Sequence, residues 1–247
     1  MASTPPQIFA PTRRAAVRRR MHQRQQLPTA AHFLFDDVAE DLAERLAFLR
    51  HTPARTIVIG DAASVIAAAL PGQVISRPAL DLETPWPEAG FDLIAITFAL
   101  DTANDLPGAL IHARNALAPG GLLLATMLGF GSLPALRAIM LAADADRPAP
   151  RIHPQVDVRA AAQLLQRAGL SDPVADGRAL DVRYRFLGTL VSDLRDHGLG
   201  NVLIQSGAPL GKAAKARADA TFTAASDGEG RMTEHFELLT LSGWRRP

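Results

Sequence analysis

Apolar positions recur along the chain with two different spacings. From Phe33 to Leu49 they fall at steps of three and four residues, which predicts an amphipathic helix. The segments 55–60, 91–100 and 122–127 are instead almost continuously apolar. Runs of this kind are typical of strands that are buried on both faces of a sheet.

Further helices and strands are predicted between Pro and Gly residues that mark the ends of elements. The helices are expected at 62–70, at 105–118, from Pro134 to about Asp146, at 157–168, at 187–197 and at 210–225, and the additional strands at 73–76, 180–185 and 236–244. Helices that alternate with fully apolar strands call for a parallel sheet covered on both faces. The expected fold class is therefore α/β.

Composition narrows the class of protein. The 247 residues correspond to one or two domains, 48% of them are hydrophobic, and no run of eighteen apolar residues could span a membrane. The formal net charge of +1 argues against a protein that works through bulk charge. Cysteine is absent and the seven histidines are scattered, so no disulfide, cysteine nucleophile or metal site is expected.

The first 30 residues differ from the rest of the chain in charge. They contain six arginines and no acidic residue, and we expect a basic helical arm over 1–32 before a single domain over 33–247. This arm is either a solvated segment that packs on the acidic body, a surface for an acidic partner, or a removable targeting peptide. Nucleic acid is not an expected partner, because no aromatic residues interleave with the arginines.

Ligands of open α/β sheets bind outside the carboxyl ends of the strands. The first strand ends in the loop Gly60-Asp61-Ala62-Ala63-Ser64. A dinucleotide loop needs glycine at three positions, and this loop has only one. An ordinary turn between a strand and a helix explains the loop equally well.

Motifs spread over nearly the whole chain resemble one enzyme superfamily. They are Ile8-Phe9 with the arginine-rich segment, Asn104-Asp105-Leu106-Pro107, Leu117-Ala118-Pro119-Gly120-Gly121, His153-Pro154, residues 164–170, Tyr184, Asp193-Leu194-Arg195 and Gly243-Trp244. In order and spacing the chain resembles class I S-adenosylmethionine methyltransferases. It is most similar to the methyltransferase-like assembly factors of respiratory complex I and to the biotin-pathway malonyl-carrier-protein methyltransferases.

The resemblance implies a seven-stranded, doubly wound, Rossmann-like sheet with a reversed last strand and S-adenosylmethionine as cofactor. The positions that it assigns to cofactor binding are Gly60, Asp61, Ala62, Ser76, Asp81, Leu82 and Thr97. The chain departs from the family pattern in the first loop, which has lost two glycines and its leading acid. It departs again at Ser76, where the family has an acid that binds the ribose hydroxyls.

Three residues are candidates for catalysis on the acceptor side: Asp101, Asn104 and Tyr184. Asp101 and Asn104 follow the strongest strand, and their alternative role is to begin and cap the next helix. Tyr184 is the only tyrosine, and its alternative role, which the residue type favours, is packing in the core with a solvated hydroxyl. His153, in a proline-rich insertion, is a weaker candidate.

Two functions of different classes remain open at this point. The first is a methyltransferase-type enzyme that acts on a protein or carrier-bound acceptor, which the resemblance extends to a complex I subunit and to arginine hydroxylation. The second is a binding or assembly module that keeps the fold and has lost the cofactor. We expect a bacterial cytoplasmic protein, or a mitochondrial matrix protein in a eukaryote.

Overall fold

The structure is a computed structural model that describes residues 6–145 and 147–247. The first five residues of the predicted arm and the predicted helix end at Asp146 lie outside the described residues. The helices are α1 (Pro11–Arg24), α2 (Phe33–Leu49), α3 (Val65–Ala69), α4 (Leu106–Ala116), α5 (Pro134–Asp144), α6 (Val158–Arg167), α7 (Leu187–Asp196) and α8 (Lys212–Ala224), with a 3-10 turn at Leu100–Thr102. The strands are β1 (Arg55–Ile59), β2 (Gln73–Ser76), β3 (Phe91–Thr97), β4 (Leu117–Leu128), β5 (Ser171–Tyr184) and β6 (Met232–Trp244).

The strands form one sheet in the order β2-β1-β3-β4-β6-β5. The first four strands in this order pair in parallel, whereas β6 pairs antiparallel with both of its neighbours. The prediction of an α/β sheet with a reversed last strand is therefore confirmed. From β1, the chain adds β2 on one side and β3 on the other, so the crevice between β1 and β3 is the point where the strand order changes direction. Open α/β sheets bind their ligands at such a point.

The predicted number of seven strands is wrong, because the described sheet has six. The missing strand would follow β2 along the chain, in the segment 77–90. That segment contains Pro78, Pro85 and Pro87. Proline has no backbone N–H to donate to a neighbouring strand, so this segment runs past the edge of the sheet without pairing.

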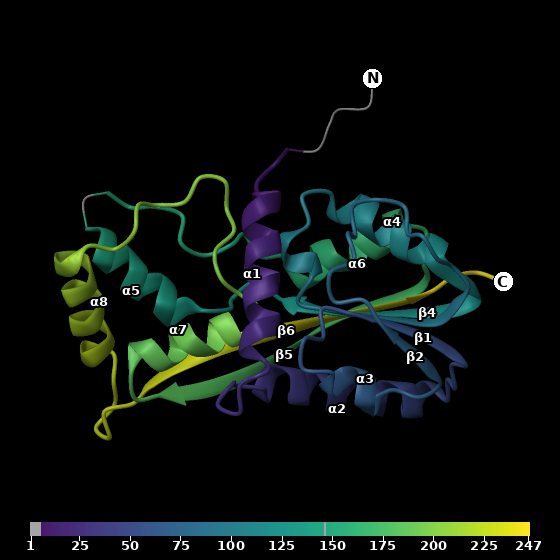
Figure 1. Cartoon of the computed structure of the whole chain (residues 1–247), viewed down its shortest axis with the longest axis horizontal. Coiled ribbons are helices and arrows are strands. Elements are labelled where there is room, and N and C mark those ends of the chain that lie inside the picture. Colours follow the sequence, from purple (N-terminus) through teal and green to yellow (C-terminus); the bar gives the residue numbers. More distant parts are fainter. Residues whose placement is uncertain (1–5, 146) are drawn as a thin grey trace.

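Helices cover both faces of the sheet (Figure 1). On one face, α2 and α3 share an apolar cluster with strand residues such as Val58 and Leu93, and α5, α7 and α8 extend the same cluster beside β5 and β6. On the other face, α4 and α6 pack against Ile57, Ile94 and Leu123. Residues that alternate along the strands thus enter two separate apolar layers, which explains why the strands are apolar at nearly every position.

Strand β5 is much longer than the predicted strand over 180–185. Its burial alternates between half-buried and exposed residues over Ser171–Tyr184. The segment contains Asp, Gly and Arg and lies at the edge of the sheet, where only one neighbour, β6, pairs with it. An edge strand of this composition carries no continuous apolar signal.

The start of α4 fixes the segment that follows β3. The Asp105 carboxylate accepts a hydrogen bond from the Gly108 amide at 2.9 Å and so caps the helix. We expect Asp105→Ala to lower the free energy of unfolding by about 1 kcal/mol, because this amide loses its partner. Urea denaturation measures the change. Asp105→Ser retains a capping oxygen and should stay within about 0.5 kcal/mol of the parent, and equal losses in both variants would contradict the capping role.

Candidate functional site

The turn after β1 brings the backbone of two strands into close contact. Gly60 has a φ of +89°, and a Cβ atom at this position would lie 1.9 Å from the carbonyl oxygen of Thr97, at the end of β3. Only glycine fits here, because a side chain would meet both a forbidden conformation and a backbone atom. Thr97 itself is fully buried, and its hydroxyl has no hydrogen-bond partner.

The two residues after Gly60 face the protein interior. The Asp61 carboxylate is buried and accepts a hydrogen bond from the Ala67 amide at 2.8 Å, so it anchors the short helix α3. Burial raises the pKa of Asp61, although amides at the start of α3 oppose this effect. Ala62 is buried in the apolar layer below α2 and α3. In this arrangement both side chains support the turn.

The candidates after β2 lie apart from one another. Ser76 is exposed at the end of the strand, and Leu82 is buried in the apolar layer on the α4 and α6 side. Asp81 is largely exposed and faces Arg14 of α1 at 3.9 Å. The structure does not join these three side chains into one binding surface.

Helix α1 crosses the carboxyl ends of the strands (Figure 1). Arg14 forms an ion pair with Glu83 and donates a hydrogen bond to the Thr102 carbonyl at 2.9 Å. Arg18 donates to the Ala99 carbonyl at 3.2 Å, and burial lowers the pKa of its guanidinium. The arm therefore packs on the body of the protein, and the division at residue 32 remains a prediction.

Asn104 holds the segment that leads into α1. Its side-chain oxygen accepts hydrogen bonds from the Ile8 and Phe9 amides, each at 2.8 Å, and its amide nitrogen donates to the Phe9 carbonyl at 3.1 Å. Phe9 also packs with Val202 and Leu203 in a small apolar cluster. Asn104 thus positions the arm in this structure.

The space beside Gly60 is too small for a cofactor while α1 is docked. It measures about 10 Å³ and is lined on the α1 side by Arg14, Val17, Arg18 and Met21. Pockets that bind small molecules are usually about 300–1,000 Å³. S-adenosylmethionine therefore does not fit beside Gly60 in this arrangement of α1.

A much larger cavity lies on the other side of α1, at the end of β4. Its volume is about 560 Å³, within the usual range for a ligand site. Apolar side chains of β4, α5 and α7 line it together with arginines of α1 and α7. They include Val17, Arg20, Met127, Leu128, Leu133, Leu136, Met140, Val191, Leu194 and Arg195.

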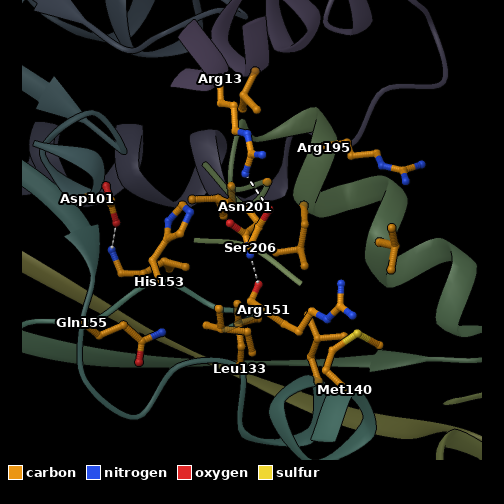
Figure 2. A pocket seen from close by; sticks show the side chains of 18 of the residues that line it. Arg13, Asp101, Leu133, Met140, Arg151, His153, Gln155, Arg195, Asn201 and Ser206 are labelled. Atoms are coloured by element: carbon orange, nitrogen blue, oxygen red, sulfur yellow. Dashed lines mark hydrogen bonds between the residues drawn. The ribbon is translucent and has the colours of Figure 1, made fainter. Parts of the chain in front are cut away.

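Asp101 lies at one side of this large cavity (Figure 2). One carboxylate oxygen accepts a hydrogen bond from the Leu128 amide at 2.7 Å, while the other is buried without a partner. Burial raises the pKa of Asp101 to about 7, although the Leu128 amide favours the charged form. Near neutral pH this carboxyl group can therefore accept or donate a hydrogen bond to a ligand.

The remaining candidates, His153 and Tyr184, lie in different places. The His153 ring lines the large cavity, accepts a hydrogen bond from the Val202 amide at 2.9 Å, and has its pKa lowered to about 4 by burial. Tyr184 is buried in the core at the end of β5, and burial raises the pKa of its phenol. Thus Asp101 and His153 share a cavity, whereas Tyr184 and Asn104 do not line it.

Arginines at the large cavity differ in how far their charge is already neutralised. Arg151 forms an ion pair with Asp144 at 2.6 Å, and Arg13 donates to the Leu203 carbonyl at 2.6 Å. Arg13 also donates to the Ser206 hydroxyl (Figure 2). Arg20 and Arg195 make no ion pair within the described part of the chain. The cavity thus combines an apolar wall with positive charge.

Glu83 is a central residue of the site that the sequence did not single out. It accepts hydrogen bonds from the amides of Asn104 at 2.8 Å and Asp105 at 2.9 Å, in addition to Arg14. Burial alone raises its pKa, but these donors outweigh burial, and the pKa of Glu83 lies below its usual value. The only signal in the sequence was the excess of arginine in the arm, which requires acidic partners on the body.

Within residues 6–145 and 147–247, no group of three or more His, Asp or Glu side chains is arranged to hold a metal ion. None of the helices in that part of the chain is both long enough and apolar enough to cross a membrane.

Curated proteins of two kinds resemble the chain in sequence. The mitochondrial arginine-hydroxylase NDUFAF5 of Rattus norvegicus is 29% identical over 165 residues, which cover 65% of this chain and 48% of the relative. The malonyl-[acyl-carrier protein] O-methyltransferase of Xylella fastidiosa is 29% identical over 161 residues, 65% of this chain and 54% of the relative. The chain thus spans about half the length of these relatives.

Among solved structures, a Bacillus halodurans protein provisionally assigned as a methyltransferase matches with a TM-score of 0.51 and 12% sequence identity, over 83% of this chain and 99% of that one. No family model matches the chain. The sheet order, with its single reversed strand, agrees with this similarity in fold. The chain therefore has a methyltransferase-like fold and is similar in sequence to these two kinds of curated protein.

Proposed function

We propose that the chain is an S-adenosylmethionine-dependent transferase that acts on a protein or carrier-bound acceptor, and that the large cavity receives the acceptor group. The observation that carries this proposal is the cavity of about 560 Å³ at the end of β4, with Asp101 in its wall. A site in this position follows the general rule for open α/β sheets. Asp101 and His153 are the side chains that we assign to the acceptor.

The class of acceptor follows from the character of the cavity and from the relatives. An apolar wall with arginines around it suits a group that arrives on a longer chain and carries polar or negative atoms. One relative is named for a carrier-bound malonyl group and the other for arginine hydroxylation. We propose a carrier-bound acyl group as the acceptor because the character of the cavity suits it. A subunit of respiratory complex I is the alternative acceptor, and only the family resemblance supports it.

The compartment is part of the same proposal. NDUFAF5 is named as mitochondrial, whereas the malonyl-carrier relatives are bacterial. We retain the bacterial cytoplasm as the proposed location, with the mitochondrial matrix as the alternative.

A second function, an assembly or binding module without a cofactor, is favoured by a specific observation. The space beside Gly60 is filled by α1, and Asp61 is turned into the protein to anchor α3. A protein that has lost its cofactor needs no open space at this position. Direct measurement of cofactor binding separates this function from the first.

The deciding experiment is thermal unfolding with and without S-adenosylmethionine and S-adenosylhomocysteine. A ligand at 100 times its dissociation constant stabilises the folded protein by roughly 2.7 kcal/mol, which raises the melting temperature of a domain of this size by about 5–10 °C. We expect such a shift at ligand concentrations up to about millimolar, with ATP as the control nucleotide. If neither ligand moved a cooperative unfolding transition, both in the wild-type chain and in variants with weakened contacts of α1, the transferase function would be excluded and the binding module would remain.

A further inference from the structure

Helix α1 separates the two cavities at the strand ends. Val17 lines both the small space beside Gly60 and the large cavity that contains Asp101. Arg14 and Arg18 lie on the Gly60 side, whereas Arg13 and Arg20 lie on the side of the large cavity. A group bound beside Gly60 and an acceptor near Asp101 have α1 between them in this arrangement.

The contacts that hold α1 in place are mostly polar. Of the residues in α1, only Met21 is buried. The polar contacts include the ion pairs of Arg14 with Glu83 and of Arg24 with Asp196, and hydrogen bonds from Arg13, Arg14 and Arg18 to backbone carbonyls. Both ion pairs are largely shielded from solvent, and the cost of desolvating their charges offsets much of the attraction, so a helix held by them can detach without unfolding the sheet.

The helix is also poor at stabilising its own start. No side chain caps α1, and its first turn contains no acidic residue to interact with the helix dipole. Tertiary contacts therefore maintain α1, and its position depends on the contacts with the strand ends.

We propose that α1 is a displaceable strap whose docking over Gly60 and binding of the cofactor at that position exclude each other. The inference rests on the proposed function, because it concerns the same cofactor position. When the strap lifts, the space beside Gly60 opens and joins the large cavity. When it docks, Val17, Arg18 and Met21 occupy the space that a ligand requires.

A reversible cross-link tests the strap directly. The chain has no cysteine, so an introduced pair forms the only possible disulfide. A Cβ atom at Gly200 would lie 3.7 Å from Cγ2 of Val17, which marks a position that the sulfur of a cysteine at residue 17 could take, so the two introduced thiols come within reach of each other after a small adjustment of the backbone. The variant Val17→Cys/Gly200→Cys should therefore join α1 to the loop after α7 under mild oxidation, which non-reducing mass spectrometry detects as the loss of two hydrogens. Failure of the two thiols to join would contradict the docked position of α1.

The measurement is the dissociation constant of S-adenosylhomocysteine, determined by calorimetry with the oxidised and the reduced protein. We expect binding at least tenfold weaker in the oxidised form and recovery after reduction, with each single-cysteine variant unaffected by oxidation. Equal affinity in the oxidised and reduced forms would overturn the strap and leave the proposed function intact.

A second pair of variants tests the strap in the case that the wild-type chain binds no cofactor because α1 stays docked. Arg14→Ala/Arg18→Ala removes contacts with Glu83, Thr102 and Ala99, whereas Arg19→Ala/Arg159→Ala removes the same charge from exposed positions outside both cavities. We expect the first variant to bind at least tenfold more tightly than the second and to exchange the amides of α1 faster with solvent. Faster exchange without any binding, in every variant, would overturn both the strap and the cofactor site.

Discussion

Gly60→Ala is expected to lower the free energy of unfolding by about 2–5 kcal/mol. The alanine methyl would lie 1.9 Å from the Thr97 carbonyl oxygen, and the backbone would have to keep a φ of +89°. The left-handed conformation costs about 1–2 kcal/mol and the overpacking about 1–3 kcal/mol. A loss of this size is a large part of the 5–15 kcal/mol that stabilises a typical domain. Urea denaturation at neutral pH measures it.

Gly120→Ala is the matched control for this substitution. Gly120 has a φ of +75°, and a Cβ atom there would meet nothing within 4 Å. This variant should lose only the conformational part, about 1–2 kcal/mol. If both variants lost the same amount, the close contact between Gly60 and Thr97 would be disproved.

The packing of Gly60 changes how its presence in the sequence is interpreted. A lone glycine after the first strand is compatible both with a ligand loop and with an ordinary turn. The contact with Thr97 requires glycine whether or not a cofactor binds. Retention of Gly60 is therefore no evidence for a cofactor, and the binding experiments have to decide.

The parts of the fold that the sequence predicted well are those with a strong local signal. Strands β1, β3 and β4 are continuous apolar runs because both faces are covered, and α2 shows regular three- and four-residue spacing. Strand β5 was underestimated, since its exposed edge position permits polar residues. The absent seventh strand was assumed from the family pattern, although three prolines between 77 and 90 argued against it.

The site was predictable only in part, because its main feature is a contact between distant segments. The sequence marked the loop at Gly60 and the strand end at Asp101, and both lie at the carboxyl ends of strands. It gave no indication that α1 lies between them, since the bond from Arg14 to Glu83 joins residues that are 69 positions apart. Charge excess in the arm predicted acidic contacts without naming them.

The wild-type protein is expected to lose stability as the pH rises, and the substitution Asp101→Asn is expected to abolish this loss. Burial raises the pKa of Asp101 from 3.8 to about 7 in the folded protein. Between these values the folded state holds a proton that the unfolded chain has lost, so the free energy of unfolding decreases with increasing pH and the decrease is complete above pH 7. The full shift corresponds to about 4 kcal/mol, and partial solvent access to Asp101 reduces the expected effect to about 2 kcal/mol.

The measurement is the difference in unfolding free energy between wild type and Asp101→Asn at pH 5 and at pH 8. His153 acts in the opposite direction, because burial lowers its pKa to about 4 and stability falls as the pH decreases from 6.5. This histidine is present in both proteins, so its contribution cancels in the difference. Asp219→Asn, at an exposed position of α8, should leave the pH dependence unchanged. If wild type and Asp101→Asn had parallel profiles from pH 5 to pH 8, Asp101 would not have the raised pKa of about 7, and its assignment as a group that exchanges a proton near neutral pH would be wrong.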